Sequence, residues 1–291
     1  MTEKNRGKVV SITGTLVAVE FDGYVSMNEI CFVKVDGAAL KSEVIRIRGK
    51  VAQVQVYEMT GGIKCGDEVE FTGEMLSAEL GPGLLGQIYD GLQNPLPALA
   101  EQAGWFLERG IYAEALDSEK KWEFTPTAQP GATLHAGEAI GTVPEGAFTH
   151  KIFVPFHLLG SYTLKSIAEK GAYNIKEPIA VLTDERGRDL SISMSFRWPV
   201  KRAIKCYRER LAPVETMETK VRLIDSFFPV AKGGTYCTPG PFGAGKTVLQ
   251  HTTSKYADVD IVIIAACGER AGEVVETLTE FPELTDPKTG R

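Results

Sequence analysis

Apolar and polar residues alternate along roughly the first seventy residues, in short runs that end at turn-forming residues. A period of two residues is typical of a strand with one buried face, and glycine-containing turns about every ten residues favour strands paired as hairpins. The alternation therefore predicts a small antiparallel β-barrel over residues 1–75. The runs that carry it are residues 15–21, 31–35, 44–48, 51–57 and 68–71.

The pattern breaks between residues 76 and 104. Gly81, Pro82 and Gly83 interrupt any strand. Beyond them, four apolar residues recur at helical spacing: Leu84, Leu85, Ile88 and Leu92. This stretch predicts a linker followed by a short helix.

Residues 105–197 contain short β-like pieces separated by proline and glycine, such as residues 139–143 and 151–154, then 179–182 and 190–194. They predict a second β-rich module, inserted between the barrel and a C-terminal α/β domain. Its charged stretch, Asp117 to Lys121, is typical of a solvated turn. Because the module shows no catalytic constellation, we expect it to mediate contacts.

From residue 198 to residue 291 the pattern is that of an α/β domain. Residues 234–238 form a short extended run, and residues 248–256 favour a helix. Residues 259–267 are almost continuously apolar, as expected for a buried strand of a parallel sheet. A second helix is predicted over residues 272–281, with Pro282 as its stop.

Between the first strand and helix of this domain lies a phosphate-binding motif, Gly-x-x-x-x-Gly-Lys-[Ser/Thr]. Its glycines let backbone N–H groups approach a phosphate, and its lysine adds positive charge at the outer oxygens. A helix N-terminus at the same place also favours an anion. We therefore predict ATP or ADP binding, with Lys246 on the phosphates and the Thr247 hydroxyl on Mg²⁺. The residues of the predicted site are Gly240, Pro241, Phe242, Gly243, Ala244, Gly245, Lys246, Thr247 and Val248.

Glu269 and Arg270 follow the predicted apolar strand at its carboxyl end. Ligands of open α/β sheets bind at this edge, where the phosphate-binding loop also emerges. Phosphoryl transfer to water requires a group that orients or deprotonates the water, and Glu269 is the carboxylate at this strand tip. Arg270 would stabilise phosphate charge or pair with Glu269. The bland alternative is that both are ordinary charges at a strand end.

The charge, the lengths of the apolar runs and the cysteine content exclude some classes of protein. With 32 basic and 38 acidic residues the net charge is −6, which argues against a nucleic-acid coat protein. The longest apolar run, residues 261–267, is far shorter than a membrane span. The five cysteines show no metal-ligand spacing and suggest reduced thiols in a cytoplasm. Of these, Cys237 and Cys267 are predicted to be buried beside the nucleotide site.

Three stretches together carry a family resemblance: residues 229–235, residues 240–248, and Cys267-Gly268-Glu269-Arg270. They resemble the catalytic subunits of rotary ATPases. The insert of about ninety residues and the glycine-rich stretch 81–91 are similar to the A subunits of V-type (archaeal and bacterial V/A-type) enzymes. The F-type β subunit lacks that insert.

The resemblance implies a subunit that alternates with three non-catalytic B subunits in a hexamer. ATP hydrolysis there turns a central stalk and drives protons or sodium ions through a membrane sector, or runs in reverse as synthesis. It implies that Lys246 contacts the β- and γ-phosphates, Thr247 binds Mg²⁺, Glu269 activates water and Arg270 lies near the γ-phosphate. The insert corresponds to a bulge domain that meets the peripheral stalk. The expected location is the cytoplasmic face of a membrane, as a peripheral subunit, with no nucleic-acid partner.

The family continues beyond the point matched by residue 291, with a magnesium-holding aspartate and an adenine pocket. We therefore expect these residues to be the N-terminal part of a longer protein, with a RecA-like parallel sheet that is incomplete in this chain. Alone, they should neither fold fully in the last hundred residues nor turn over ATP.

Two other classes share the phosphate-binding motif. Homohexameric export-apparatus ATPases and hexameric RNA helicases would also have the glutamate, but the insert and the acidic balance count against them. A subunit that holds ATP without cleaving it is a second alternative, against which the presence of Glu269 argues.

Overall fold

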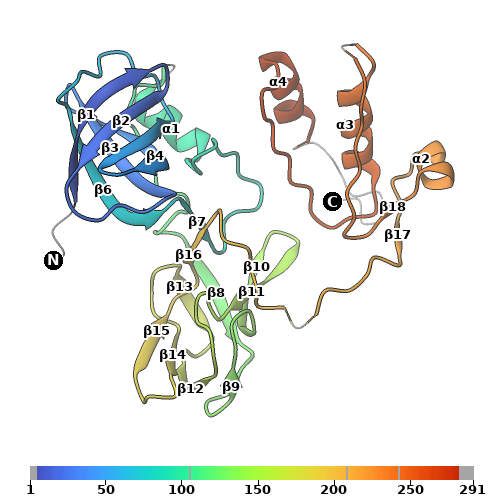
Figure 1. Cartoon of the computed structure of the whole chain (residues 1–291). Helices are drawn as coiled ribbons and strands as arrows, with labels where there is room; N and C mark the ends of the chain where they lie inside the picture. Colours follow the sequence, from blue (N-terminus) through green and yellow to red (C-terminus); the bar gives the residue numbers. More distant parts are fainter. Residues whose placement is uncertain (1–4, 105, 208, 242, 282–291) are drawn as a thin grey trace. The chain divides into compact units, whose positions relative to one another are not determined.

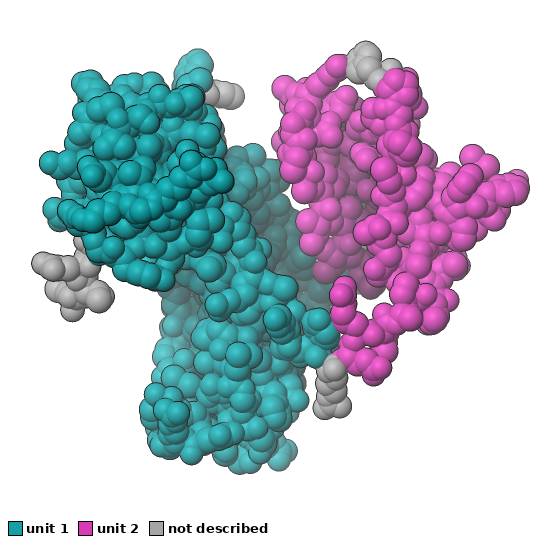
Figure 2. All heavy atoms as spheres, in the orientation of Figure 1, with its two compact units in different colours: residues 1–207 teal, residues 208–291 magenta. Residues whose placement is uncertain are grey.

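The computed structural model describes residues 5–104, 106–207, 209–241 and 243–281. Phe242 of the predicted phosphate-binding loop and Pro282, the predicted helix stop, lie outside these ranges. The chain divides into two units, residues 1–207 and residues 208–291 (Figure 2). None of the described helices is long and apolar enough to cross a membrane.

Unit 1 begins with a closed, fully antiparallel barrel of six strands (Figure 1). Their order around the barrel is β1-β2-β5-β4-β3-β6, and β6 pairs back onto β1. Alternate side chains of each strand face inward, and the core includes Val17, Leu40, Val54 and Phe71, each 0–1% exposed. The predicted antiparallel barrel is confirmed. The strands are β1 (Arg6–Thr13), β2 (Leu16–Phe21), β3 (Glu29–Val35), β4 (Ala38–Arg48), β5 (Val51–Val56) and β6 (Glu68–Met75).

The helix predicted from Leu84 to Leu92 is wrong. Gly83 and Gly86 adopt positive φ angles of 107° and 72°, which end any helix. Asp90 then accepts the backbone N–H groups of Leu92 and Asn94 in a turn. The helix of this region is α1 (Leu96–Ala103), which begins after Pro95.

The insert is built from two four-stranded sheets that share one core. Packing between β10 and β8 requires glycine at position 141, because a Cβ there would lie 2.2 Å from Phe124 Cε2. The predicted β-rich character is confirmed. The sheets are ordered β11-β10-β8-β13 and β15-β14-β12-β9, with bounds β8 (Lys121–Pro126), β9 (Thr133–Leu134), β10 (Ala139–Glu145), β11 (Phe148–Phe153), β12 (Tyr162–Ile167), β13 (Gly171–Asn174), β14 (Ala180–Thr183) and β15 (Asp189–Ile192).

The chain enters and leaves the insert through two paired strands, β7 (Ser77–Leu80) and β16 (Phe196–Pro199). Just beyond β16, Lys201 Nζ lies 2.6 Å from Glu43 Oε1, a carboxylate on β4 that is 7% exposed. The Glu43 carboxylate also accepts a hydrogen bond from Tyr57, at 2.8 Å. This buried carboxylate therefore attaches the returning chain to the barrel.

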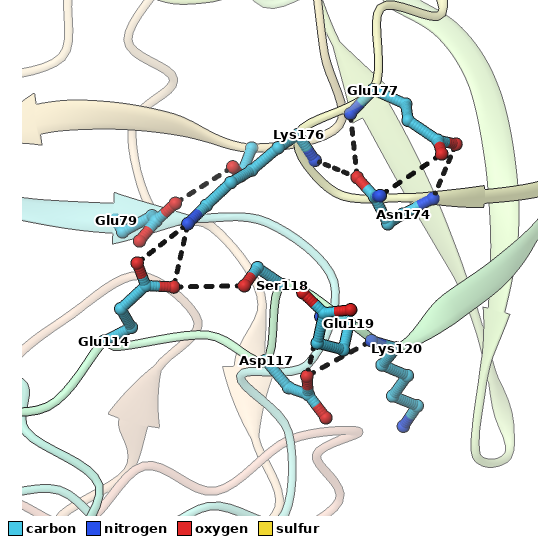
Figure 3. A network of polar contacts seen from close by, with 10 residues as sticks. Glu79, Glu114, Asp117, Ser118, Glu119, Lys120, Asn174, Lys176 and Glu177 are labelled. Carbon is cyan, nitrogen blue, oxygen red and sulfur yellow. Dashed lines mark hydrogen bonds and ion pairs between the residues drawn. The ribbon is translucent and has the colours of Figure 1, made fainter.

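A polar network fixes the segment that leads into the first sheet of the insert (Figure 3). Lys176 donates to both oxygens of Glu114, at 2.9 and 2.8 Å. The Asp117 carboxylate accepts the backbone N–H groups of Glu119 and Lys120. The predicted solvated turn is confirmed for residues 117–120, whereas Lys121 is the first residue of β8.

Unit 2 has little secondary structure apart from its helices. Its described strands are β17 (Thr216–Met217) and β18 (Val230–Ala231), which pair antiparallel. The helices are α2 (Arg222–Phe227), α3 (Lys246–Tyr256) and α4 (Ala271–Glu280). The helices predicted over residues 248–256 and 272–281 are confirmed.

The predicted strands of a parallel sheet are not formed in unit 2. Residues 234–238 and 259–267 belong to no strand, and Ile263 is 89% exposed. An apolar run becomes a strand only where neighbouring strands accept its backbone hydrogen bonds, and no described strand pairs with these residues. Cys237 and Cys267 are correspondingly exposed, which corrects their predicted burial.

Candidate nucleotide-binding site

The phosphate-binding motif leads directly into α3. Gly243 and Gly245 have φ angles of 78° and 77°, a left-handed conformation that favours glycine. Gly245 is the N-cap of α3, and no side chain caps the helix there. The first N–H groups of α3 are therefore available to an anion, and the helix dipole favours negative charge at the same place.

The remaining described loop residues keep the motif compact. Gly240, Pro241 and Ala244 lie in the loop, and a Cβ on Gly240 would come within 3.1 Å of the Ala244 Cβ. Lys246 Nζ folds back over the loop and donates to the carbonyl oxygens of Gly240 and Pro241, at 2.6 and 3.2 Å. The lysine charge therefore lies at the loop where phosphate oxygens would bind.

Thr247 and Val248 occupy the first turn of α3 with opposite surroundings. The Val248 side chain is 70% exposed. The Thr247 hydroxyl donates to Glu273 Oε2 of α4, at 3.2 Å. The structure thus places a second carboxylate beside the predicted metal-binding hydroxyl.

Glu269 and Arg270 lie at the start of α4. Arg270 is its N-cap residue, and Glu269 precedes it. The pKa of the Glu269 carboxyl is raised, chiefly by its hydrogen bond with Glu273 and then by loss of solvent and by the negative charge of Glu273. Electrostatic interactions with His251 and Lys246 oppose this rise in the pKa. Lys246, Thr247 and Glu269 therefore belong to one electrostatic cluster.

Glu273 was not among the residues predicted from the sequence. It lies in the first turn of α4, where the helix dipole stabilises a carboxylate. The signal that would have found it is an acidic residue in the first turn of the predicted helix that follows Glu269 and Arg270.

The donor set fits Mg²⁺. A threonine hydroxyl and neighbouring carboxylates are the hard oxygen ligands this ion prefers, and Mg²⁺ is usually held by few protein ligands together with waters and phosphate oxygens. Among the described residues, no group of three or more His, Cys, Asp or Glu side chains could hold a metal alone. A hydroxyl beside carboxylates suits a metal ion that also binds the phosphate oxygens of a nucleotide.

A barrel followed by a β-rich insert and a phosphate-binding loop with an adjacent carboxylate defines a nucleotide-binding protein of the P-loop class. Three successive stretches match domains of the ATP synthase alpha/beta family: residues 9–73 its beta-barrel domain, residues 113–201 its barrel-sandwich domain, and residues 220–289 its nucleotide-binding domain. The chain belongs to this family.

Relatives identify the branch of the family. The chain is 68% identical over 288 residues to the V-type ATP synthase alpha chain of Treponema denticola, covering 99% of this chain and 49% of that one. It is 60% identical over 288 residues to the V-type ATP synthase alpha chain of Borrelia garinii subsp. bavariensis, covering 99% and 50%. The chain spans about half the length of the curated relatives it matches, and corresponds to their N-terminal half.

Proposed function

We propose that this chain carries the phosphate-binding and water-activating groups of a V-type rotary ATPase. ATP hydrolysis, or synthesis in reverse, would be coupled to proton or sodium transport across a membrane. The observation that supports this most directly is the grouping of Lys246, Thr247 and Glu269 at the facing ends of α3 and α4. The family membership and the V-type relatives support the same activity.

Each residue has a role that reflects its place. Lys246 would leave the carbonyls of Gly240 and Pro241 for the β- and γ-phosphate oxygens, which carry full negative charge. Residues 240–248 would surround the phosphates with backbone N–H groups. The Thr247 hydroxyl would exchange Glu273 for Mg²⁺, which neutralises charge on the phosphate oxygens. Glu269 would accept a proton from the attacking water, and Arg270 would stabilise charge near the γ-phosphate.

The raised pKa of Glu269 suits a base. A carboxyl whose pKa lies above its ordinary value is a stronger proton acceptor once ionised. Lys246 and its bound phosphates change the local charge, so the protonation of Glu269 depends on the occupancy of the site.

The test replaces Glu269 by Gln in the full-length protein assembled with its partners. Turnover should fall by a factor on the order of 10² or more while nucleotide binding is retained, because only the proton acceptor is lost. The matched control is Glu276→Gln, an exposed carboxylate on α4, the helix that follows Glu269. Undiminished turnover in Glu269→Gln would refute the role of Glu269. Absence of turnover in the unaltered assembly would favour a subunit that only holds nucleotide.

The proposed partners are non-catalytic B subunits in an alternating hexamer, a central stalk, and a peripheral stalk that meets the insert at residues 105–197. The proposed domain limits are residues 1–75, 76–104, 105–197 and 198–291. The proposed location of the protein is the cytoplasmic face of the membrane. A neighbouring subunit would supply an arginine to the site, an effect on the order of 10³-fold or more. Full turnover by a purified monomer would contradict this proposal, and RNA-stimulated turnover would favour a helicase instead.

A further inference from the structure

Side chains from α3 and α4 meet at three successive turns. Thr247 contacts Glu273 at the first turn, His251 contacts Thr277 at the second, and Lys255 contacts Glu280 at the third. The α3 residues are four apart, so they share one face of that helix. Both helices run in the same direction along this seam, which we call the α3–α4 seam and define by these six residues.

The middle contact has a defined direction. The Thr277 hydroxyl donates its single proton to the Glu273 carbonyl oxygen, at 2.9 Å. Its oxygen lies 3.1 Å from His251 Nε2 and is left to accept a hydrogen bond. Nε2 of His251 therefore carries the proton that joins the two helices. The contact runs from His251 through Thr277 to the backbone of Glu273.

The His251 ring is also held by packing. It lies edge-on to the Phe281 ring, with centroids 5.4 Å apart and an interplanar angle of 80°. The orientation of the His251 ring is thus fixed by two contacts, one with the Phe281 ring and one with the Thr277 hydroxyl. The Lys255–Glu280 pair is partly exposed to solvent, where an ion pair contributes little to stability. The second turn is therefore the best-defined contact of the seam.

The first contact is the one that ligand binding removes. If the Thr247 hydroxyl turns to Mg²⁺, its hydrogen bond to Glu273 is lost. Of the three contacts of the α3–α4 seam, the second and third then remain to hold α4 against α3. Since a helix rises about 1.5 Å per residue, a slip of one residue would displace Glu269 by about that distance from Lys246.

From this arrangement we infer that His251 and Thr277 are positioning residues that fix the register of α4 on α3 while the nucleotide is bound. They act on the site through Glu273 and Glu269, since Thr277 bonds both to His251 and to the backbone of Glu273. The inference rests on the proposed function for its kinetic readout. A misplacement of about 1 Å can cost a factor of ~10² in rate, so kcat should respond more than affinity does.

The experiment compares four single variants and one double variant of the assembled full-length protein. Thr277→Val removes the hydroxyl and keeps the side-chain shape. His251→Phe removes the ring N–H and keeps a ring against Phe281, and His251→Gln restores a donor. The matched control is Thr279→Val, whose hydroxyl donates to the Val275 carbonyl oxygen of its own helix, at 2.8 Å.

We expect kcat to fall about 10-fold or more in Thr277→Val and in His251→Phe, with metal-free nucleotide affinity changed less than about 3-fold. His251→Gln should recover part of the loss, and Thr279→Val should match the unaltered protein. The double variant His251→Phe/Thr277→Val should be no worse than either single variant, because both break one contact.

Three outcomes would overturn the inference: Thr277→Val and Thr279→Val having equal kcat, additive losses in the double variant, or loss of metal-free nucleotide affinity in proportion to kcat. Proportional loss would mean general destabilisation of the site. Failure of the proposed function is distinguishable, since the unaltered assembly would then show no turnover. In that case the metal-free affinity and hydrogen exchange of α4 amides still test the seam: faster exchange in Thr277→Val than in Thr279→Val supports it, and equal exchange refutes it.

Discussion

The barrel of unit 1 and the apolar stretch 259–267 of unit 2 are both rich in Val and Ile, yet their side chains differ completely in exposure. Val17, Val19 and Val54 of the barrel are 0% exposed, whereas Ile263 is 89% exposed. Among the described residues of unit 2, the only buried apolar side chains are those of Ile224 and Val230. The two regions show that hydrophobic content does not create a core unless partner strands are present.

The difference arises from connectivity. Antiparallel strands can find partners through turns of a few residues, so the barrel completes itself within residues 6–75. Parallel strands need crossover connections of a dozen or more residues, and their neighbours come from distant parts of a chain. Residues 259–267 have no such neighbour among the described residues.

The largest expected difference between the two regions is in the rate of amide hydrogen exchange, measured on the 291-residue chain. Amides of β4 and β5 should exchange only through global opening, whereas those of residues 259–267 have no ladder to protect them. The expected difference in protection is on the order of 10⁴-fold. Comparable protection in the two regions would mean that 259–267 forms hydrogen-bonded structure in solution.

The second largest difference is expected when a large apolar side chain is truncated to alanine in each region. Phe71 is 1% exposed within the barrel, so Phe71→Ala should lower the free energy of unfolding of unit 1 by about 3–5 kcal/mol through a cavity. Ile263→Ala should change stability by no more than about 0.5 kcal/mol, because its side chain is already in solvent. Urea denaturation measures both, and equal effects would contradict the comparison.

Removing an ion pair should also cost more stability in unit 1 than in unit 2, although the difference is smaller than for the core truncation. Lys201→Ala leaves the Glu43 carboxylate without its cation, and we expect a loss of about 2 kcal/mol, below that of a fully buried pair since Lys201 is half exposed. Lys232→Ala breaks the exposed pair with Glu215 in unit 2 and should cost under about 0.5 kcal/mol. Thermal melts of each unit measure both losses of stability. A loss in Lys232→Ala as large as that in Lys201→Ala would contradict the prediction.

The smallest predicted effect concerns alkaline pH. Burial, and then a hydrogen bond to Glu58, raise the pKa of Tyr112. The unfolded chain loses this phenol proton first, near pH ~10, so the stability of unit 1 is intact below that pH and declines above it until the folded-state pKa is reached. Tyr112→Phe should make the decline shallower, while Tyr24→Phe, at an exposed position, serves as the control. An unchanged slope in Tyr112→Phe would refute this assignment.

The sequence predicted the barrel because alternation and turn residues act locally. It predicted α3 and α4 for the same reason, since helical pattern and the glycines before Lys246 are short-range signals. Burial of Cys267 was wrongly expected because burial depends on partners that no local pattern contains. The helix expected at Leu84 was wrong because the positive φ angles of Gly83 and Gly86 outweigh apolar spacing.

Within the site, the motif itself indicated Lys246 and Thr247 but not the groups that they face. Glu273 was missed because its role arises from contact between two helices. The spacing of Thr247, His251 and Lys255 in steps of four was visible in the sequence. This spacing did not show which helix packs against these three residues, because that contact is made only in the folded structure.

The pairing of β7 with β16 bears on how such a chain can gain or lose parts. Leu80 and Phe196 stand opposite each other in this ladder, so the path departs and returns at neighbouring positions. A loop whose ends already touch can grow at small entropic cost, which rises only with the logarithm of its length. The strands β8 to β15, which lie between these two residues, can therefore be lengthened, shortened or exchanged during evolution while the barrel keeps its course.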